Sequence, residues 1–392
     1  MHYFLIHGRL KALSVAELKA VLSLYPKFRY TLNTRADTYI TIDTDIPEEL
    51  MSKLFSRLGG FLKYGILVGE DPDFLAQYSN QPAIKFGVSY YPYNEKEFGS
   101  SKVESYAQKI KENLKRLGVN ARYTVGRGNT LSTGSILQNQ LLEKGFELSV
   151  LETSDKNLLI GKTIAIQDIE GFTERDYDKP GYDKEMGMLP PKLARIMLNL
   201  ATVKENGAVW DPFCGSGVIL MEAMLLGYDV IGSDISGEAV ASTENNIKWM
   251  AQKYNLKDQK FNVFVHDISK EDAKLQKTLR NTQIDAVVFE PYMGPPQRKV
   301  LAPNRAMKLV EEVSKLLESV YAKLEYIKAP QLKVVAVIPS YKTFDGWVSP
   351  RFNSFLSKKW KVLNSEFKEK DLHWSRSNSI IRRNILVTQL KK

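Results

Sequence analysis

A glycine loop between an apolar strand and an apolar helix constrains the fold of this chain more than any other feature. Ala208–Trp210 predicts a strand, Val218–Leu226 predicts a helix, and the loop between them contains Gly215 and Gly217. Glycine lets a backbone approach a ligand closely and adopt conformations that other residues avoid. Apolar strands and helices alternate from residue 190 onward, which is typical of βαβ units. We therefore expect an α/β domain with a parallel sheet here.

The charges around this loop indicate a cationic ligand. Asp211 opens the loop, and Asp234 ends the next predicted strand, 17 residues after Gly217. In a doubly wound sheet, a carboxylate at that place accepts hydrogen bonds from ribose hydroxyls. The loop matches neither GxGxxG nor GxxxxGK[ST], and Asp211 would repel a pyrophosphate. A ligand with an amine and a sulfonium fits this loop, which predicts S-adenosyl-L-methionine as the cofactor.

The loop Asp211–Gly217 resembles the cofactor loop of class I methyltransferases that modify exocyclic amines of nucleic acids. The resemblance implies a Rossmann-like domain in which Asp234 and Ile235 lie at the ribose. It also implies that Asp267 meets the adenine amino group and that Met188 covers the methionine. The implied cofactor-binding residues are Met188, Asp211, Phe213, Cys214, Gly215, Ser216, Gly217, Asp234, Ile235 and Asp267.

These enzymes usually carry an Asp/Asn-Pro-Pro-aromatic run after the fourth strand. Here the β-forming residues Ala286–Phe289 lead into Glu290-Pro291-Tyr292, which departs from that run by a longer acid and an earlier aromatic. The resemblance implies that Glu290 accepts a hydrogen from the target amine, that Pro291 stiffens the turn, and that Tyr292 stacks on an extruded base. An inactive or repurposed site is the alternative for this variant motif.

The only cysteine excludes several other classes of protein. Carbon-5 pyrimidine methylation needs a cysteine nucleophile beside the base, whereas Cys214 lies in the cofactor loop. One cysteine forms no intrachain disulfide and no multi-cysteine zinc site. The four histidines show no metal-ligand spacing, so we expect no metal.

The first 165 residues resemble a ferredoxin-like domain followed by a THUMP domain, and together with the later motifs the chain resembles THUMP-containing tRNA (guanine-N2)-methyltransferases. Within them, Ser14 is expected to cap a helix, and residues 71–82 are expected to be a linker. The expected domains are 1–72 (ferredoxin-like), 73–167 (THUMP-like, RNA-binding), 168–189 (connector) and 190–392 (Rossmann-like methyltransferase). The implied RNA-binding residues are Lys109, Arg116, Arg122, Arg127 and Lys162.

The net charge of +10 and the pI near 9.2 favour a polyanionic partner. Residues 1–190 carry 24 basic and 24 acidic side chains, so the whole excess falls in residues 191–392. Arg382 and Arg383 belong to this excess, and they are expected either to line an RNA path or to be solvated. The sequence contains no run of roughly 18–20 apolar residues and no signal-peptide pattern, so we expect a cytoplasmic protein without a membrane partner.

The function expected from these observations is methylation of the exocyclic N2 of a guanosine in tRNA, at D-stem position 10 by resemblance. A DNA adenine-N6 or cytosine-N4 methyltransferase shares the cofactor loop and the amine chemistry, and it is the first alternative. The second alternative is a catalytically silent RNA-binding protein. A requirement for a small activating subunit stays open.

Overall fold

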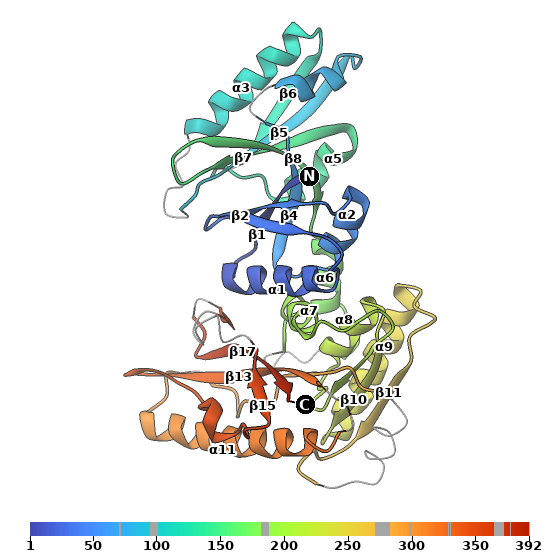
Figure 1. The fold of residues 1–392 in the computed structure, drawn as a ribbon, viewed down its shortest axis with the longest axis vertical. Helices are drawn as coiled ribbons and strands as arrows, with labels where there is room; N and C mark the ends of the chain where they lie inside the picture. Colours follow the sequence, from blue (N-terminus) through green and yellow to red (C-terminus); the bar gives the residue numbers. More distant parts are fainter. Residues whose placement is uncertain are drawn as a thin grey trace. The chain divides into compact units, whose positions relative to one another are not determined.

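The protein, described here from a computed structural model, folds into two compact units (Figure 1). The structure describes residues 1–69, 72–94, 101–126, 128–181, 188–270, 283–297, 299–327, 329, 331–363, 372–376 and 378–391. Unit 1 contains Met1–Ser14, Tyr25–Ser56 and Gly60–Ile169, and unit 2 contains Val15–Leu24, Arg57–Gly59 and Glu170–Lys392.

Unit 1 is built on one eight-stranded sheet with the strand order β2-β3-β1-β4-β8-β7-β5-β6. Its β5–β6 and β5–β7 pairs are parallel, and β4 pairs with β8 in antiparallel fashion. The β4–β8 pair joins the ranges 1–72 and 73–167 in a single sheet, and their division into two domains stays a prediction. The strands are β1 (His2–His7), β2 (Tyr30–Arg35), β3 (Tyr39–Thr44), β4 (Phe61–Leu67), β5 (Ala83–Tyr91), β6 (Asn120–Val125), β7 (Gly145–Glu152) and β8 (Leu158–Ile166).

Two local predictions in the N-terminal half are wrong. The first helix begins at Lys11, so Ser14 is an internal residue whose hydroxyl donates to the carbonyl of Leu10 at 3.0 Å instead of capping the helix. The predicted linker contains a 3₁₀ helix, in which Leu75 is fully buried in a core formed with α3 and the sheet. The helices are α1 (Lys11–Ser23), α2 (Glu48–Ser56), η1 (Pro72–Tyr78), α3 (Ser101–Arg116), α4 (Thr133–Gln138) and α5 (Leu141–Lys144).

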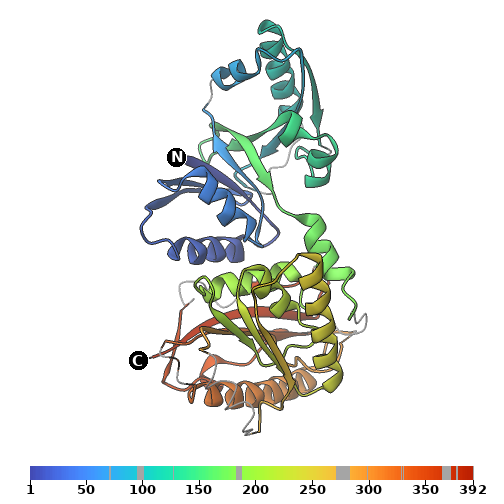
Figure 2. The same ribbon diagram turned by 90° about the vertical axis from the view of Figure 1, so that its right-hand side faces the viewer.

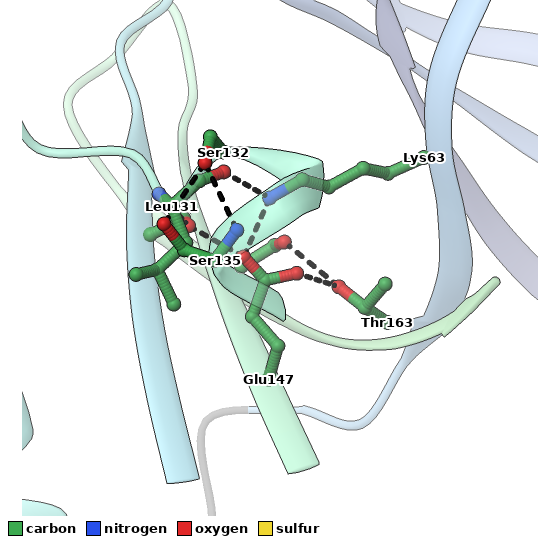
Figure 3. A network of polar contacts seen from close by, with 8 residues as sticks. Lys63, Leu131, Ser132, Ser135, Glu147 and Thr163 are labelled. Atoms are coloured by element: carbon green, nitrogen blue, oxygen red, sulfur yellow. Dashed lines mark hydrogen bonds and ion pairs between the residues drawn. The ribbon is translucent and has the colours of Figure 1, made fainter. Parts of the chain in front are cut away.

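A buried polar network crosses the middle of the unit 1 sheet (Figure 3). Lys63 Nζ on β4 lies 2.6 Å from Glu147 Oε1 on β7, and both side chains are at most 3% exposed. Glu147 also accepts hydrogen bonds from the hydroxyls of Ser89 at 2.6 Å and Thr163 at 2.7 Å. Lys63 donates in addition to the carbonyl of Leu131 at 2.9 Å, so the network ties the loop before α4 to the four strands β4, β5, β7 and β8. Burial disfavours the charged ammonium, but Tyr91 and Glu147 nevertheless hold the pKa of Lys63 above its ordinary value.

Unit 2 contains the predicted α/β sheet, with the strand order β11-β10-β9-β12-β13-β17-β15. The strands from β11 to β13 are parallel, whereas β17 runs antiparallel to β13. Because β17 is reversed, its first residues lie at the edge where the parallel strands end. The strands are β9 (Ala208–Asp211), β10 (Asp229–Asp234), β11 (Phe261–Val265), β12 (Ala286–Phe289), β13 (Lys333–Thr343), β14 (Gly346–Val348), β15 (Trp360–Val362), β16 (His373–Trp374) and β17 (Ile381–Leu390).

Helices cover both faces of this sheet, with α7 and α8 on one face and α11 on the other (Figure 2). Helix α8 is almost entirely buried, and its Glu222 is held by Arg175 Nε and Arg195 Nη2, each at 2.6 Å. Among the helices that the structure describes, none is both long and apolar enough to cross a bilayer. The helices are α6 (Ile169–Tyr177), α7 (Pro191–Ala201), α8 (Val218–Leu225), α9 (Gly237–Lys253), α11 (Pro303–Leu324) and the 3₁₀ helix η3 (Phe352–Ser354).

Candidate active site

The glycine loop connects β9 to α8, as predicted, and it has a conformation that requires glycine. Gly215 and Gly217 have φ values of +52° and +79°. A Cβ atom on Gly217 would lie 2.9 Å from the side chain of Thr243 on α9. The same helix holds the loop, because Thr243 Oγ1 donates to the carbonyl of Gly215 at 2.7 Å and Asn246 Nδ2 donates to that of Ser216 at 2.8 Å. The loop is therefore preformed.

Three carboxylates lie at the ends of three neighbouring parallel strands: Asp211 on β9, Asp234 on β10 and Glu290 directly after β12. Asp211 is 1% exposed and accepts a 3.0 Å hydrogen bond from the N–H of Phe213. Burial raises the pKa of Asp211 well above its ordinary value, and the charges of Asp234 and Glu290 raise it further. A bound cation would relieve this repulsion, so the site fits a ligand that carries an ammonium and a sulfonium.

Asp234 links the ribose position to the glycine loop. Its Oδ2 accepts the N–H of Gly215 and its Oδ1 accepts the N–H of Ser236, both at 3.0 Å. Each carboxylate oxygen has two lone pairs, so both can still accept a hydroxyl. The carboxylate is thus oriented by backbone donors while it keeps acceptor capacity for a ribose.

An apolar surface flanks Asp234 at the same edge of the sheet. Ile235 is 70% exposed, and Val265, paired in register with Asp234, is 52% exposed. Asp267 lies two residues after Val265, and its Oδ1 accepts the hydroxyl of Ser269 at 2.6 Å, which lowers the pKa of Asp267. A flat apolar ring such as adenine fits between such side chains. Val265 was not identified from the sequence, although its place at the end of a predicted strand is the signal that points to it.

The other predicted cofactor residues lie within or beside the loop. Met188 Sδ lies 3.6 Å from Ser216 Oγ, which places it over the loop. The ring of Phe213 packs at 5.5 Å from that of Phe289. The thiol of Cys214 is buried, and burial together with Asp211 raises its pKa, so this cysteine packs in the core and is not a nucleophile. Within the described ranges, no group of three or more His, Cys, Asp or Glu side chains is arranged to hold a metal ion.

The variant motif follows β12 as predicted. Pro291 is buried, whereas Tyr292 is 62% exposed and can stack on a base. Burial raises the pKa of Glu290, and the charge and hydrogen bonding of Arg383 oppose this shift. Arg383 lies on β17 with its Nε 2.5 Å from Glu290 Oε1. The expectation that Arg383 lines an RNA path or is solvated is therefore wrong, because this side chain is only 9% exposed.

The four predicted RNA-binding residues that the structure describes lie on three different elements of unit 1. Lys109 and Arg116 are exposed on α3, and Arg122 is exposed on β6. Its neighbours Ala121 and Tyr123 pack toward α3, so Arg122 points to the opposite face of the sheet. Lys162 lies on β8, where its Nζ is 5.7 Å from the centre of the Tyr78 ring. Arg127 lies outside the described residues.

Comparison with known proteins supports the assignment of unit 2. The family model described as RMKL-like, methyltransferase domain, matches residues 181–292. A tRNA (guanine(10)-N2)-dimethyltransferase of Methanocaldococcus jannaschii is 34% identical over 167 residues, which are 40% of this chain and 45% of the relative. The enzyme of the same name from Pyrococcus abyssi is 27% identical over 83% of this chain and 86% of its own length.

The crystal structure of TrmN from Thermus thermophilus superposes over 100% of both chains with a TM-score of 0.52 and 15% identity, which shows a common fold. The chain spans about half the length of the first two curated relatives that it matches, 45% and 56%. The relatives confirm the resemblance to tRNA (guanine-N2)-methyltransferases, and they do not test the resemblance to a THUMP domain. This chain therefore carries an α/β, Rossmann-like methyltransferase domain whose family match covers residues 181–292 and includes the glycine loop and the Glu290-Pro291-Tyr292 motif.

Proposed function

We propose that this protein is an S-adenosyl-L-methionine-dependent tRNA methyltransferase that modifies the exocyclic N2 of a guanosine, at D-stem position 10. The observation that carries the proposal is the placement of Glu290-Pro291-Tyr292 at the sheet edge, beside the preformed glycine loop. Relatives named tRNA (guanine(10)-N2)-dimethyltransferase support tRNA as the substrate. A cytoplasmic location is part of the same proposal.

Some residues of the site bind the cofactor, and others position the target amine. Asp211 offsets the positive charge of the cofactor, Asp234 holds its ribose, and Ile235 packs against its adenine. S-adenosyl-L-methionine supplies the methyl group when it is bound. The lone pair of an exocyclic amine is delocalised into the base, so the amine reacts slowly until its hydrogens are held by acceptors. Glu290 is one such acceptor, and the exposed Tyr292 offers a ring on which an extruded base stacks.

A labelled methyl donor tests this proposal directly. The purified chain is incubated with radiolabelled S-adenosyl-L-methionine and either unmodified tRNA transcripts or DNA, and the modified nucleoside is then identified. We expect N2-methylated guanosine in tRNA and no label in DNA. Methylated adenine or cytosine in DNA would support the first alternative, and RNA binding without any transfer would support either the silent protein or a need for an activating subunit. Because only the purified chain is present, the assay also tests the need for an activating subunit.

Glu290→Ala tests the catalytic part of the proposal in the same assay. We expect the rate to fall while the affinities for cofactor and tRNA stay near those of the wild type, because the acceptor acts mainly in the transition state. Glu49→Ala, which removes an exposed carboxylate on α2, is the control. Full activity of Glu290→Ala would contradict the role of this carboxylate.

Binding by the basic residues of unit 1 is a separate part of the proposal. Lys109→Glu combined with Arg116→Glu should weaken tRNA binding and flatten its salt dependence, because each lost phosphate contact reduces counterion release. Lys53→Glu on α2 is the control, since Lys53 is an exposed lysine of the same unit outside the predicted site. Unchanged binding and salt dependence of the double variant would direct attention to the basic residues of unit 2.

A further inference from the structure

Glu290, the acceptor of the variant motif, is held by an arginine that lies two strands away in the sheet. Glu290 follows β12, and Arg383 lies on β17, with β13 between these two strands. Arg383 Nε lies 2.5 Å from Oε1, and Arg383 Nη2 lies 3.4 Å from Oε2 of the same carboxylate. The two side chains are 9% and 15% exposed. A guanidinium that faces both oxygens of a carboxylate fixes its plane as well as its position.

Arg383 is itself supported on a second side. The centre of its guanidinium lies 5.1 Å from the centre of the Trp374 ring. Trp374 belongs to β16 and is paired in register with Arg383. A planar guanidinium stacks well on an aromatic face, which a lysine ammonium does not reproduce. The arginine is therefore held in one orientation between an indole and a carboxylate.

The charge of the pair decides what Glu290 can do. An ionised carboxyl only accepts hydrogen bonds, whereas a protonated carboxyl also donates one. Arg383 on β17 is the charged group that acts on Glu290, and the charge of Glu290 in turn raises the pKa of Asp211 at the end of β9. The buried surroundings favour the protonated form of Glu290, and Arg383 favours the ionised one. Arg383 also bonds a side chain that is one methylene longer than the family's usual acid.

From this arrangement we propose that Arg383 is a positioning residue, which fixes Glu290 as a charged acceptor for two adjacent N–H donors such as N1–H and N2–H of guanine. The inference rests on the proposed function and explains how the variant motif suits that base. Because Arg383 faces both oxygens, the lone pairs left on them diverge, and the two adjacent N–H donors converge on the free side of one carboxylate oxygen. Adenine and cytosine present an acceptor nitrogen beside their amine, and a carboxylate repels that nitrogen.

The first test measures methyl transfer by the full-length protein as a function of pH. Arg383→Gln should lower the single-turnover rate at neutral pH roughly tenfold or more, with unchanged affinities for tRNA and cofactor. The acid limb of its pH–rate profile should move to higher pH, because the carboxylate protonates more readily without the guanidinium. Arg383→Lys keeps the positive charge but loses the paired N–H donors of the guanidinium. Compared with Arg383→Gln, it should return the acid limb of the pH–rate profile to its wild-type position and recover only part of the wild-type rate.

Lys315→Gln is the control for loss of a cation that is paired with a glutamate. Lys315 lies on α11, its Nζ is 2.7 Å from Glu311 Oε1, and its side chain is 72% exposed. We expect its rate and pH profile to match those of the wild type. A wild-type rate and pH profile in folded Arg383→Gln would overturn the positioning role. If Arg383→Gln does not fold, Arg383→Lys decides the question. A wild-type pH–rate profile together with a wild-type rate in Arg383→Lys would show that the paired N–H donors of the guanidinium are not needed.

The second test changes the base. A tRNA with 2-aminopurine at the target position keeps the 2-amine but lacks N1–H. The wild type should methylate it at least tenfold more slowly than guanine, because a buried acceptor would face a ring nitrogen. Glu290→Gln should show a much smaller difference between the two bases, since its amide can donate to that nitrogen. Equal rates on both bases in the wild type would overturn the selection of the donor pair.

The two proposals fail in different ways. Absence of N2-methylguanosine with the wild type removes the proposed function and this inference together. N2-methylation by the wild type, without an effect of Arg383→Gln or 2-aminopurine, removes the inference alone.

Discussion

The backbone N–H of Gly215 donates a 3.0 Å hydrogen bond to Oδ2 of Asp234. One residue belongs to the loop after β9, and the other ends β10, so this bond joins the two parts of the cofactor site. The geometry of the loop and the orientation of the carboxylate therefore depend on each other.

Asp234→Ala should weaken binding of S-adenosyl-L-methionine more than binding of tRNA. Loss of hydrogen bonds to a charged acceptor costs about 1.5–3 kcal/mol, which is roughly tenfold or more in affinity. Calorimetry of both ligands checks this expectation. Asp229→Ala is the control, because Asp229 begins the same strand at its opposite end. Cofactor affinity equal to that of the control would remove Asp234 from the site.

Gly217→Ala should both destabilise unit 2 and weaken cofactor binding. A residue with a side chain at φ +79° is strained by about 1–2 kcal/mol, and its Cβ would also lie 2.9 Å from Thr243. Gly227→Ala is the control. Gly227 has a similar φ of +85°, but a Cβ atom added there would have no neighbour within 4 Å, so this variant adds the backbone strain without displacing the glycine loop. Tryptophan fluorescence reports on unit 2, because all five tryptophans lie between residues 210 and 374. Equal cofactor affinities of the two variants would contradict the prediction.

Lys63→Met should destabilise unit 1 strongly. It leaves the buried Glu147 carboxylate without its cation, and breaking a buried pair in this way costs about 3–5 kcal/mol. Lys53→Met breaks the exposed pair with Glu49 and should cost about 0.3–0.5 kcal/mol. Hydrogen exchange of the amides of β4, β7 and β8 measures the difference. A small loss of protection in Lys63→Met would mean that the network rearranges.

Unit 1 should lose stability in mild acid because of His7. Burial and the nearby Lys11 lower the pKa of His7 from 6.5 to about 4, so the unfolded chain binds the proton more readily. The free energy of unfolding therefore decreases as the pH falls from about 6.5 to about 4, by about 3 kcal/mol at most. Urea unfolding followed by far-UV circular dichroism at several pH values tests this. His7→Phe should flatten the dependence, whereas replacement of the exposed His2 by Gln should leave it unchanged.

The sequence predicted the α/β unit well because the periodicity of each element agrees with its burial. The predicted strand Ala208–Trp210 is one residue shorter than β9, and the predicted helix Val218–Leu226 is one residue longer than α8. The glycine loop was predictable for a different reason, since glycine adopts positive φ angles more readily than any other residue.

Other features depend on contacts between distant residues and were not predictable. Gln140, for example, adopts a φ of +53° and separates α4 from α5. The burial of Arg383 depends on the pairing of β17 with β13, which places this charge near a carboxylate 93 positions away. The local sequence pattern predicts neither the break at Gln140 nor the contact between Glu290 and Arg383.

The Glu290–Arg383 pair also has a consequence for how related sequences diverge. An asparagine at position 290 would leave a nearly buried guanidinium without its counter-charge, and a shorter acid would hold that charge farther from it. An uncharged residue at 383 would leave the carboxylate unpaired. Either single change is costly, whereas the two changes together are tolerable. Positions 290 and 383 are therefore expected to covary among homologues, even though the family match ends at residue 292 and does not include β17.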